Sequence, residues 1–207
     1  HIPFCETKCN YCDFNTYAGI ESLMPTYIKA LRNEVTFWGT WLDNPIVNTV
    51  FFGGGTPSYL PEKHLQYLLD TIGTSFTIDR NAEITLEANP GDLDDRKLLE
   101  YIRLGVNRLS IGVQSFDDRL LKVLSRRHTA TDAIKAFNRA SMAGFDNISI
   151  DLMYGLPSQT LYDWKSTLDT ASGLNLSHIS MYCLTLEGGT PLERWVNQGI
   201  IQDPDPD

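Results

Sequence analysis

The sequence predicts an α/β fold in which helices alternate with six parallel strands. Short apolar runs rich in β-branched residues alternate with amphipathic stretches, the pattern of repeated β-α units. The 207 residues, 42% of them hydrophobic, are enough to bury one large core. Six such strands either close partway into a barrel or form an open doubly wound sheet. Both arrangements place ligand sites at the carboxyl ends of the strands.

The strands are predicted from short runs of aliphatic, aromatic and β-branched residues. The chain begins with His1 inside the end of a first strand, which we place at residues 1–4. Five further strands are expected at residues 48–52, 83–88, 108–113, 147–153 and 178–184.

The helices are predicted from apolar residues that recur at spacings of three and four. Pro25 and Pro61 suit the first turn of a helix, and Gly105 and Gly144 suit the left-handed position just past a helix end. Thr160, with Asp163 three residues later, is a candidate helix cap. We interpret the apolar stripes as core packing. They comprise Tyr27, Leu31, Val35, Trp38 and Leu42, then Leu65, Leu68, Leu69 and Ile72, then Leu98 and Ile102, then Ile134 and Phe137, and then Leu161, Trp164 and Leu168.

Composition and charge exclude some classes of function. The formal net charge of -9 argues against a nucleic-acid surface, which needs clustered Lys and Arg. No apolar run approaches the roughly 20 residues that span a bilayer. Residues 202–207 resemble a linker, so we expect the chain to be the core of a longer protein.

Three cysteines within eight residues are the most informative motif. Cys5, Cys9 and Cys12 can hold three irons of a four-iron cluster and leave the fourth iron open to a ligand. The alternative is a structural zinc site with His1 or Cys183 as the fourth ligand, although zinc ribbons repeat paired cysteines and no second pair is present. A disulfide would leave an odd thiol. Cys183 is expected to be a buried strand residue.

The turn after the second strand, residues 53–58, reads Gly-Gly-Gly-Thr-Pro-Ser. Its missing side chains predict that backbone amides approach a charged group of a ligand closely. The turn lacks the spacing of a P-loop or of a dinucleotide-binding fold, so we propose neither ATP nor NAD. Alone, such a sequence is a tight turn more often than a binding site.

Polar residues also follow the later strands. Glu87 ends the third strand and can accept two hydrogen bonds from a ribose diol, or it is a solvated charge. Gln114 ends the fourth strand and offers both a donor and an acceptor. Asp151 interrupts an otherwise apolar run and therefore needs a cation or a ligand. Arg126 is its expected partner, and a structural ion pair is the alternative interpretation.

Four segments together resemble a known family. They are residues 1–14 with the cysteines, 51–58, 112–116 and 149–157. They resemble radical S-adenosylmethionine (SAM) enzymes, and within them the proteins similar to oxygen-independent coproporphyrinogen III oxidase. The resemblance implies a partial (β/α)6 TIM-like barrel over residues 1–186, with residues 187–207 starting a linker to a C-terminal domain.

The resemblance also implies the cofactors and the residues that hold them. Cys5, Cys9 and Cys12 would carry a 4Fe-4S cluster, and SAM would chelate its fourth iron before one electron cleaves SAM to methionine and a 5'-deoxyadenosyl radical. By position, Tyr11 would contact the adenine side, Glu87 the ribose, and Gly54, Gly55 and Thr56 the methionine end. Gln114, Arg126 and Asp151 would complete the pocket.

Phe14 separates two branches of this family. True oxidases carry a fourth cysteine at this position, whereas Cys-Asp-Phe resembles the heme chaperone branch (HemW), which delivers heme to respiratory proteins. The alternatives are oxidative decarboxylation of coproporphyrinogen III to protoporphyrinogen IX in heme biosynthesis, radical modification of nucleic acid or protein, and a zinc-stabilised binding module.

Partners and location follow from the same resemblance. It implies heme or a porphyrin, a reductant such as flavodoxin or ferredoxin, and heme-receiving proteins, with a homodimer left open and no nucleic acid expected. An oxygen-sensitive cluster and the lack of a disulfide pattern predict a cytoplasmic protein, with membrane association through partners as an option.

Overall fold

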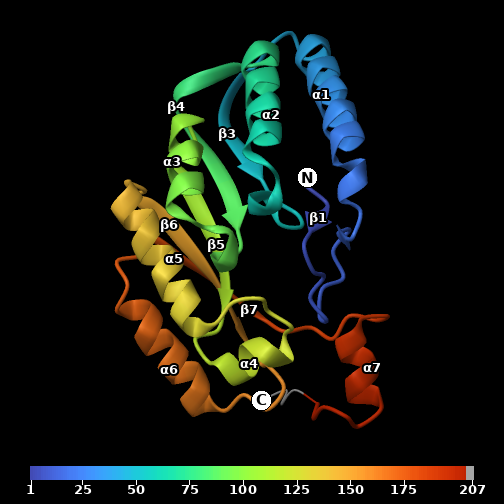
Figure 1. The fold of residues 1–207 in the computed structure, drawn as a ribbon, viewed down its shortest axis with the longest axis vertical. Coiled ribbons are helices and arrows are strands. Elements are labelled where there is room, and N and C mark those ends of the chain that lie inside the picture. Colours follow the sequence, from blue (N-terminus) through green and yellow to red (C-terminus); the bar gives the residue numbers. More distant parts are fainter. Residues whose placement is uncertain (204–207) are drawn as a thin grey trace.

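The computed structural model describes residues 1–203, and its centre is a curled parallel sheet that forms a half barrel (Figure 1). The sheet contains five strands in the order β3-β4-β5-β6-β7, so neighbours in sequence are neighbours in space. Every pair in it is parallel. The predicted α/β partial barrel is therefore confirmed. The strands are β3 (Ile46–Phe52), β4 (Thr77–Ala88), β5 (Arg108–Gln114), β6 (Asn147–Tyr154) and β7 (His178–Cys183).

The first strand differs from the prediction. Ile2 forms only an isolated parallel bridge with Gly54, and β1 is the pair Phe4–Cys5. β1 pairs in parallel with β2 (Tyr17–Ala18), a strand that the sequence analysis missed because two residues carry no periodicity. β4 also begins earlier than predicted, at Thr77.

The helices coincide with the predicted stripes, with two additions, but some stripe residues are not in the core: Leu161 is 84% exposed, Leu42 47% and Trp38 43%. The structure contains α1 (Met24–Trp41), α2 (Glu62–Ser75), α3 (Asp95–Arg103), α4 (Asp118–Val123), α5 (Ala130–Ala143), α6 (Leu161–Ser172) and α7 (Pro191–Asn197). Short 3-10 turns stand at η1 (Glu21–Leu23), η2 (Pro57–Tyr59) and η3 (Pro90–Asp92). Helices α4 and α7 were not predicted, because each is too short to show a repeat of apolar residues.

The helix ends follow local chemistry. The Thr160 hydroxyl accepts a hydrogen bond from the backbone amide of Asp163, whose carboxylate completes a capping box, as predicted. Gly144 has φ 110° just past α5, the left-handed conformation expected there. Pro25 lies in the first turn of α1, whereas Pro61 is the residue before α2 rather than within its first turn.

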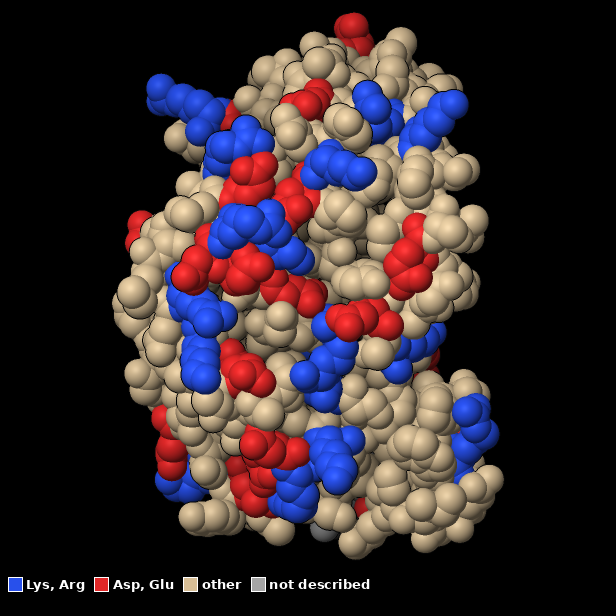
Figure 2. All heavy atoms as spheres, viewed as in Figure 1, with Lys and Arg blue, Asp and Glu red and all other residues tan. Residues whose placement is uncertain are grey.

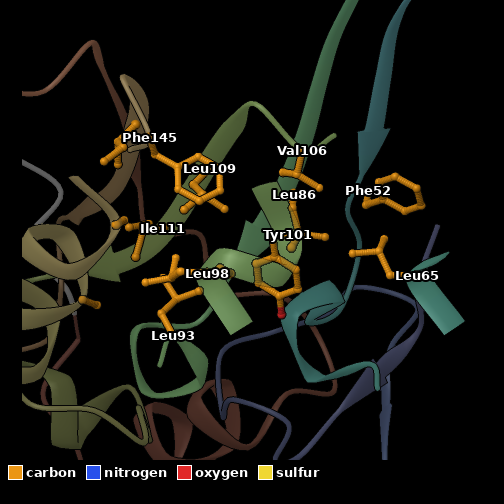
Figure 3. Packing of buried hydrophobic residues seen from close by; sticks show 14 of the residues in the cluster. Phe52, Leu65, Leu86, Leu93, Leu98, Tyr101, Val106, Leu109, Ile111 and Phe145 are labelled. Atoms are coloured by element: carbon orange, nitrogen blue, oxygen red, sulfur yellow. The ribbon is translucent and has the colours of Figure 1, made fainter. Parts of the chain in front are cut away.

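The main core lies between the sheet and the helices that cover one face of it (Figure 1, Figure 3). Leu86, Leu109 and Ile111 are fully buried there on neighbouring strands. Side chains of a strand alternate between its two faces. On β5, Leu109 and Ile111 therefore pack into this core, whereas Ser110 and Gln114 line a cavity on the other face.

Residues 187–203, predicted to start a linker, include the short helix α7. Thr190 caps α7 by accepting a hydrogen bond from the amide of Glu193, and Leu192 is fully buried. Leu192 belongs to a second hydrophobic group, the loop-end cluster, which lies beside the cysteine-bearing segment. Its members are Leu120, Leu124, Met153, Leu156, Leu184 and Leu192. The boundary at residue 186 stays a prediction, and residues 204–207 lie outside the described part of the chain.

The surface charges are mixed in sign. Figure 2 shows Lys and Arg interspersed with Asp and Glu on one face. Ion pairs such as Arg96 with Glu62 at 2.7 Å and Arg103 with Glu100 at 2.6 Å account for part of this mixing. Among residues 1–203, no helix is both long enough and apolar enough to cross a bilayer.

Candidate functional site

A cavity of about 470 Å³ opens at the carboxyl ends of the strands. It collects residues from the N-terminal segment, from the turns that follow β3, β4, β5 and β7, and from within strands β4 to β7. All of the site residues predicted from the sequence line it, although they are spread over most of the chain. They are Cys5, Cys9, Tyr11, Cys12, Gly54, Gly55, Thr56, Glu87, Gln114, Arg126 and Asp151.

Each cysteine of the N-terminal segment has a polar neighbour. The Thr56 hydroxyl donates to Cys5 Sγ at 3.4 Å, and Arg126 Nη1 donates to Cys9 Sγ at 3.4 Å. Cys12 Sγ lies 3.9 Å from the Thr16 hydroxyl, and burial raises the pKa of this thiol. Residues 5–12, which we call the cysteine loop, also turn back on themselves through a hydrogen bond from the Cys12 amide to the Cys9 carbonyl at 3.2 Å.

The spacing of the cysteines favours a cluster over a single zinc ion. Within residues 1–203, no three His, Cys, Asp or Glu side chains converge closely enough to hold one metal ion. A zinc ion needs its ligand atoms at about 2.0–2.3 Å, whereas a cluster carries its cysteine ligands on separate irons. Of the proposed fourth zinc ligands, His1 lies outside the cavity lining and its Nε2 bonds the Asn15 carbonyl, whereas Cys183 lines the cavity and its Sγ donates to the Leu184 carbonyl.

Cys183 differs from the prediction in one respect. It ends β7 as expected of a strand residue, but it is exposed rather than buried. The reason is topological, because β7 is the last strand of the sheet order and has a neighbour on one side only.

The glycine turn holds the protein's own N-terminal segment. The amides of Gly55 and Thr56 donate to the carbonyls of Ile2 and Phe4 at 2.7 and 2.9 Å, and the Gly54 amide donates to Glu87 Oε2 at 3.0 Å. The predicted cradle of backbone amides is thus occupied by the chain itself. A Cβ atom at Gly55 would lie 2.8 Å from the Phe4 carbonyl oxygen and 3.0 Å from Cys5 Sγ. Glycine is therefore required where β1 brings Cys5 against the turn.

The predicted ion pair between Arg126 and Asp151 does not form. Arg126 Nη2 donates to the Gly112 carbonyl at 2.7 Å and its other branch reaches Cys9, whereas Asp151 accepts from the Ser110 hydroxyl at 3.2 Å. The two side chains line the same cavity, but each forms its hydrogen bonds with other residues. Burial raises the pKa of Asp151. Arg126 Nε is buried without a hydrogen-bond partner.

Glu87 and Tyr11 are both half-buried polar residues of the cavity wall. Burial raises the pKa of the Glu87 carboxyl, although the Gly54 amide partly opposes the shift. Burial raises the pKa of Tyr11 even more strongly, so its phenol stays neutral. The Tyr11 ring packs against the loop-end cluster.

Tyr182 is a cavity residue that the sequence analysis did not single out. Its hydroxyl donates to Gln114 Oε1 at 2.6 Å. Gln114 itself has a φ of 67°, an unusual conformation for a residue other than glycine and one that marks functional positions. The position of Tyr182 on β7 could have indicated its role. It lies two residues after Ser180, so the two side chains are on the same face of the strand.

Comparison with known proteins agrees with this geometry. A family model described as the radical SAM superfamily matches residues 1–171. The heme chaperone HemW of Bacillus subtilis (strain 168) is 41% identical over 205 residues, which cover 99% of this chain and 54% of that protein. HemW of Escherichia coli (strain K12) is 42% identical over 192 residues, covering 92% of this chain and 50% of that protein.

A solved structure gives the same result. Coproporphyrinogen III oxidase (HemN) from Escherichia coli, described as a radical SAM enzyme, superposes with a TM-score of 0.89 at 28% sequence identity. The superposition covers 99% of this chain and 48% of that one. The chain therefore spans about half the length of the curated relatives it matches.

Proposed function

Because the chain belongs to the radical SAM superfamily, we propose that it is the 4Fe-4S- and SAM-binding core of a HemW-like heme chaperone. One observation carries the proposal. Three cysteines from the N-terminal segment and the SAM-pocket residues predicted on separate strands line a single cavity. This family implies both cofactors, and the donor set of the cavity fits them.

The cysteines fit a cluster held by thiolates. Cys5, Cys9 and Cys12 would be its ligands, and the bound cluster supplies the electron that cleaves SAM. Thr56 and Arg126 already donate to Cys5 and Cys9, so they stabilise negative charge on those two sulfur atoms. This charge assistance is expected around thiolate ligands, because hydrogen bonds to the sulfurs tune the potential of a cluster.

The remaining cavity residues fit a ligand that carries both charges. Glu87 and Asp151 are carboxylates in the cavity wall, and burial without a matched cation disfavours their charged forms. A sulfonium ligand such as SAM would offset that charge. Arg126 has a buried Nε without a partner, which is a donor available to a ligand's carboxylate. We assign Glu87 to the ribose, Tyr11 to the adenine side, Gly54, Gly55 and Thr56 to the methionine end, and Gln114, Arg126 and Asp151 to the rest of the pocket.

The heme part of the proposal rests on the relatives and on Phe14. The named heme chaperones are about 40% identical over nearly the whole chain. Phe14 lines the cavity and is 63% exposed, so an aromatic ring stands where the oxidase branch is expected to carry a cysteine. The proposed partners are heme, a reductant such as flavodoxin or ferredoxin, and heme-receiving respiratory proteins. The proposed location is the cytoplasm, and a homodimer is the proposed alternative to a monomer.

The proposal is tested by reconstituting the full-length protein anaerobically with iron and sulfide and then titrating it with SAM and with heme. We expect about four irons per chain and saturable binding of both ligands. Cys9→Ala is expected to abolish the cluster, and Cys183→Ala, which removes the remaining cysteine, is the matched control that keeps it. Zinc without iron would refute the cluster, and a cluster-loaded protein that binds no heme would refute the chaperone assignment.

A second candidate function is coproporphyrinogen III oxidase activity. The observation that favours it is the HemN superposition at a TM-score of 0.89. The same reconstituted protein, supplied with SAM, a reductant and coproporphyrinogen III, would then form protoporphyrinogen. Heme binding without product formation would favour the chaperone.

A further inference from the structure

Two consecutive arginines contact the cysteine loop, one near its start and one near its middle. Arg126 Nη1 lies 3.4 Å from Cys9 Sγ. Arg127 Nη1 donates to the carboxylate of Glu6, the residue directly after Cys5. Arg126 belongs to the proposed SAM pocket, whereas nothing in that function requires Arg127.

The second branch of Arg127 reaches a buried carboxylate. Arg127 Nη2 lies 2.9 Å from Asp92 Oδ1, in the 3-10 turn η3 that follows β4. The Asp92 side chain is only 7% exposed and that of Arg127 20% exposed, whereas that of Glu6 is half exposed. The planar guanidinium thus joins two carboxylates, a task for which lysine lacks the geometry. We call these three residues the Glu6-Arg127-Asp92 clamp.

Asp92 is anchored to the rigid part of the fold. Its Oδ2 accepts from the Ser58 hydroxyl at 2.7 Å, and the Ser58 hydroxyl oxygen accepts from the Asn89 amide at 3.1 Å. Ser58 is fully buried in the turn after β3, and Asn89 is buried at the end of β4. The clamp therefore connects the cysteine loop to two strand ends rather than to another exposed loop.

We propose that Arg127 is a positioning residue that holds the cysteine loop in its cluster-binding conformation through the Glu6-Arg127-Asp92 clamp. The inference rests on the proposed cluster. It deepens that function by naming what keeps the loop closed over the cluster. Loss of a cluster requires its ligand loop to open, so the lifetime of the cluster reports on the clamp.

The direction in which neutralising Glu6 changes the lifetime of the cluster separates the clamp from simple electrostatics. Neutralising Glu6 removes a negative charge next to Cys5, which by itself relieves repulsion with thiolate ligands and lengthens the cluster's lifetime. If the clamp holds the loop, neutralising Glu6 shortens that lifetime instead. Asp13 provides a matched control, because it is an exposed carboxylate close after Cys12 with no ion pair among residues 1–203.

The experiment measures the half-life of the cluster absorbance in the full-length reconstituted protein after addition of a chelator. Glu6→Gln is expected to shorten the half-life about threefold, the size of a partly exposed ion pair. Arg127→Gln is expected to shorten it about tenfold or more, because it also leaves Asp92 buried without its cation. Arg127→Lys should fall between Arg127→Gln and the wild type. Asp13→Asn and Arg119→Gln, whose arginine bridges Asp117 and Asp163 outside the loop, should not shorten it.

The decisive result is the coupling between the two residues. In the Arg127→Gln background, Glu6→Gln is expected not to shorten the half-life further, since the contact is already lost. If Arg127→Gln does not fold, Glu6→Lys replaces it in the test, because the exposed position of Glu6 tolerates charge reversal. The clamp then predicts a half-life for Glu6→Lys that is shorter than that of Glu6→Gln. Additive effects, or lifetimes equal to those of the controls, overturn the clamp alone. A wild-type protein that takes up no cluster overturns the proposed function and the clamp with it.

Discussion

The main core and the cysteine-loop end of the molecule are stabilised by different means. Behind the sheet, the main core is a continuous layer of aliphatic side chains from β3 to β6 and the covering helices. At the loop end, the loop-end cluster is small, and buried polar groups such as His128 and Asn10 lie near it. This comparison shows that nonspecific apolar burial stabilises the sheet and its covering helices, whereas the cysteine-loop end depends on individual hydrogen bonds and charges.

The largest effect is expected in the main core. Leu109→Ala, on the central strand β5, should lower the free energy of unfolding by about 3 kcal/mol, because it leaves a cavity in a fully packed layer. Chemical denaturation of the ligand-free protein measures it. Leu161→Ala, at a position 84% exposed, is the control and should change stability by less than about 0.5 kcal/mol. Equal losses in the two variants would contradict the packing argument.

The second largest effect is a pH dependence of stability that comes from His128. Burial, with the nearby Arg126 charge, lowers the pKa of His128 to about 4, and its Nε2 lies 3.1 Å from the Val113 carbonyl oxygen. The unfolded chain takes up the proton near pH 6.5, so the stability is complete above that pH and falls as the pH drops toward 4. Between pH 7 and pH 5 the loss should reach about 2 kcal/mol.

The control for this effect is His128→Gln, which removes the titrating group and keeps a donor for the Val113 carbonyl. Denaturation curves at pH 5 and pH 7 should show a loss for this variant that is smaller than the wild-type loss by about 2 kcal/mol. Identical pH dependence in the two proteins would mean that His128 is not buried as a neutral group.

A smaller effect is expected for helix α7. Leu192 is fully buried in the loop-end cluster, and its amide donates to the Asn10 carbonyl of the cysteine loop at 3.0 Å. Leu192→Ala should lower global stability by only about 1 kcal/mol, because α7 opens locally before the main core unfolds. Hydrogen exchange should accelerate in α7 and in the cysteine loop.

Ile200→Ala, at an exposed position close after α7, is the matched control and should leave exchange unchanged. A stability loss for Leu192→Ala as large as that for Leu109→Ala would break the distinction between the two regions, since it would show one cooperative core.

The smallest effect has the opposite sign. Burial raises the pKa of Asp151, so its carboxylate destabilises the ligand-free fold above the unfolded pKa near 3.8. Asp151→Asn should therefore increase the free energy of unfolding at pH 7, by less than about 1 kcal/mol, and still weaken SAM binding. Thermal unfolding and a binding titration check the two signs. Ser180→Ala, at the β7 position opposite Asp151, removes one hydrogen bond to that carboxyl and serves as the comparison. An Asp151→Asn variant that is less stable and binds SAM normally would show that Asp151 is not part of the SAM pocket.

The sequence by itself determined strands β3 to β7, the longer helices and many of the cavity residues. Strands β3 to β7 and the longer helices show local periodicity, and residues that follow parallel strands must meet at one edge of the sheet. Glu87, Gln114 and Asp151 therefore reached one cavity with the cysteines, as predicted. The resemblance to a family added the cofactors that this cavity fits.

Only the tertiary structure decided which of those residues contact one another. Arg126 bonds Cys9 and Gly112 instead of Asp151, Arg127 joins Glu6 to Asp92, and Cys183 is exposed at the edge of the sheet. Such pairings depend on the register of strands and on turns far apart in sequence. Local periodicity reports which face a residue occupies, but a hydrogen bond is made or lost within about 0.5 Å, and that precision exists only in the folded chain.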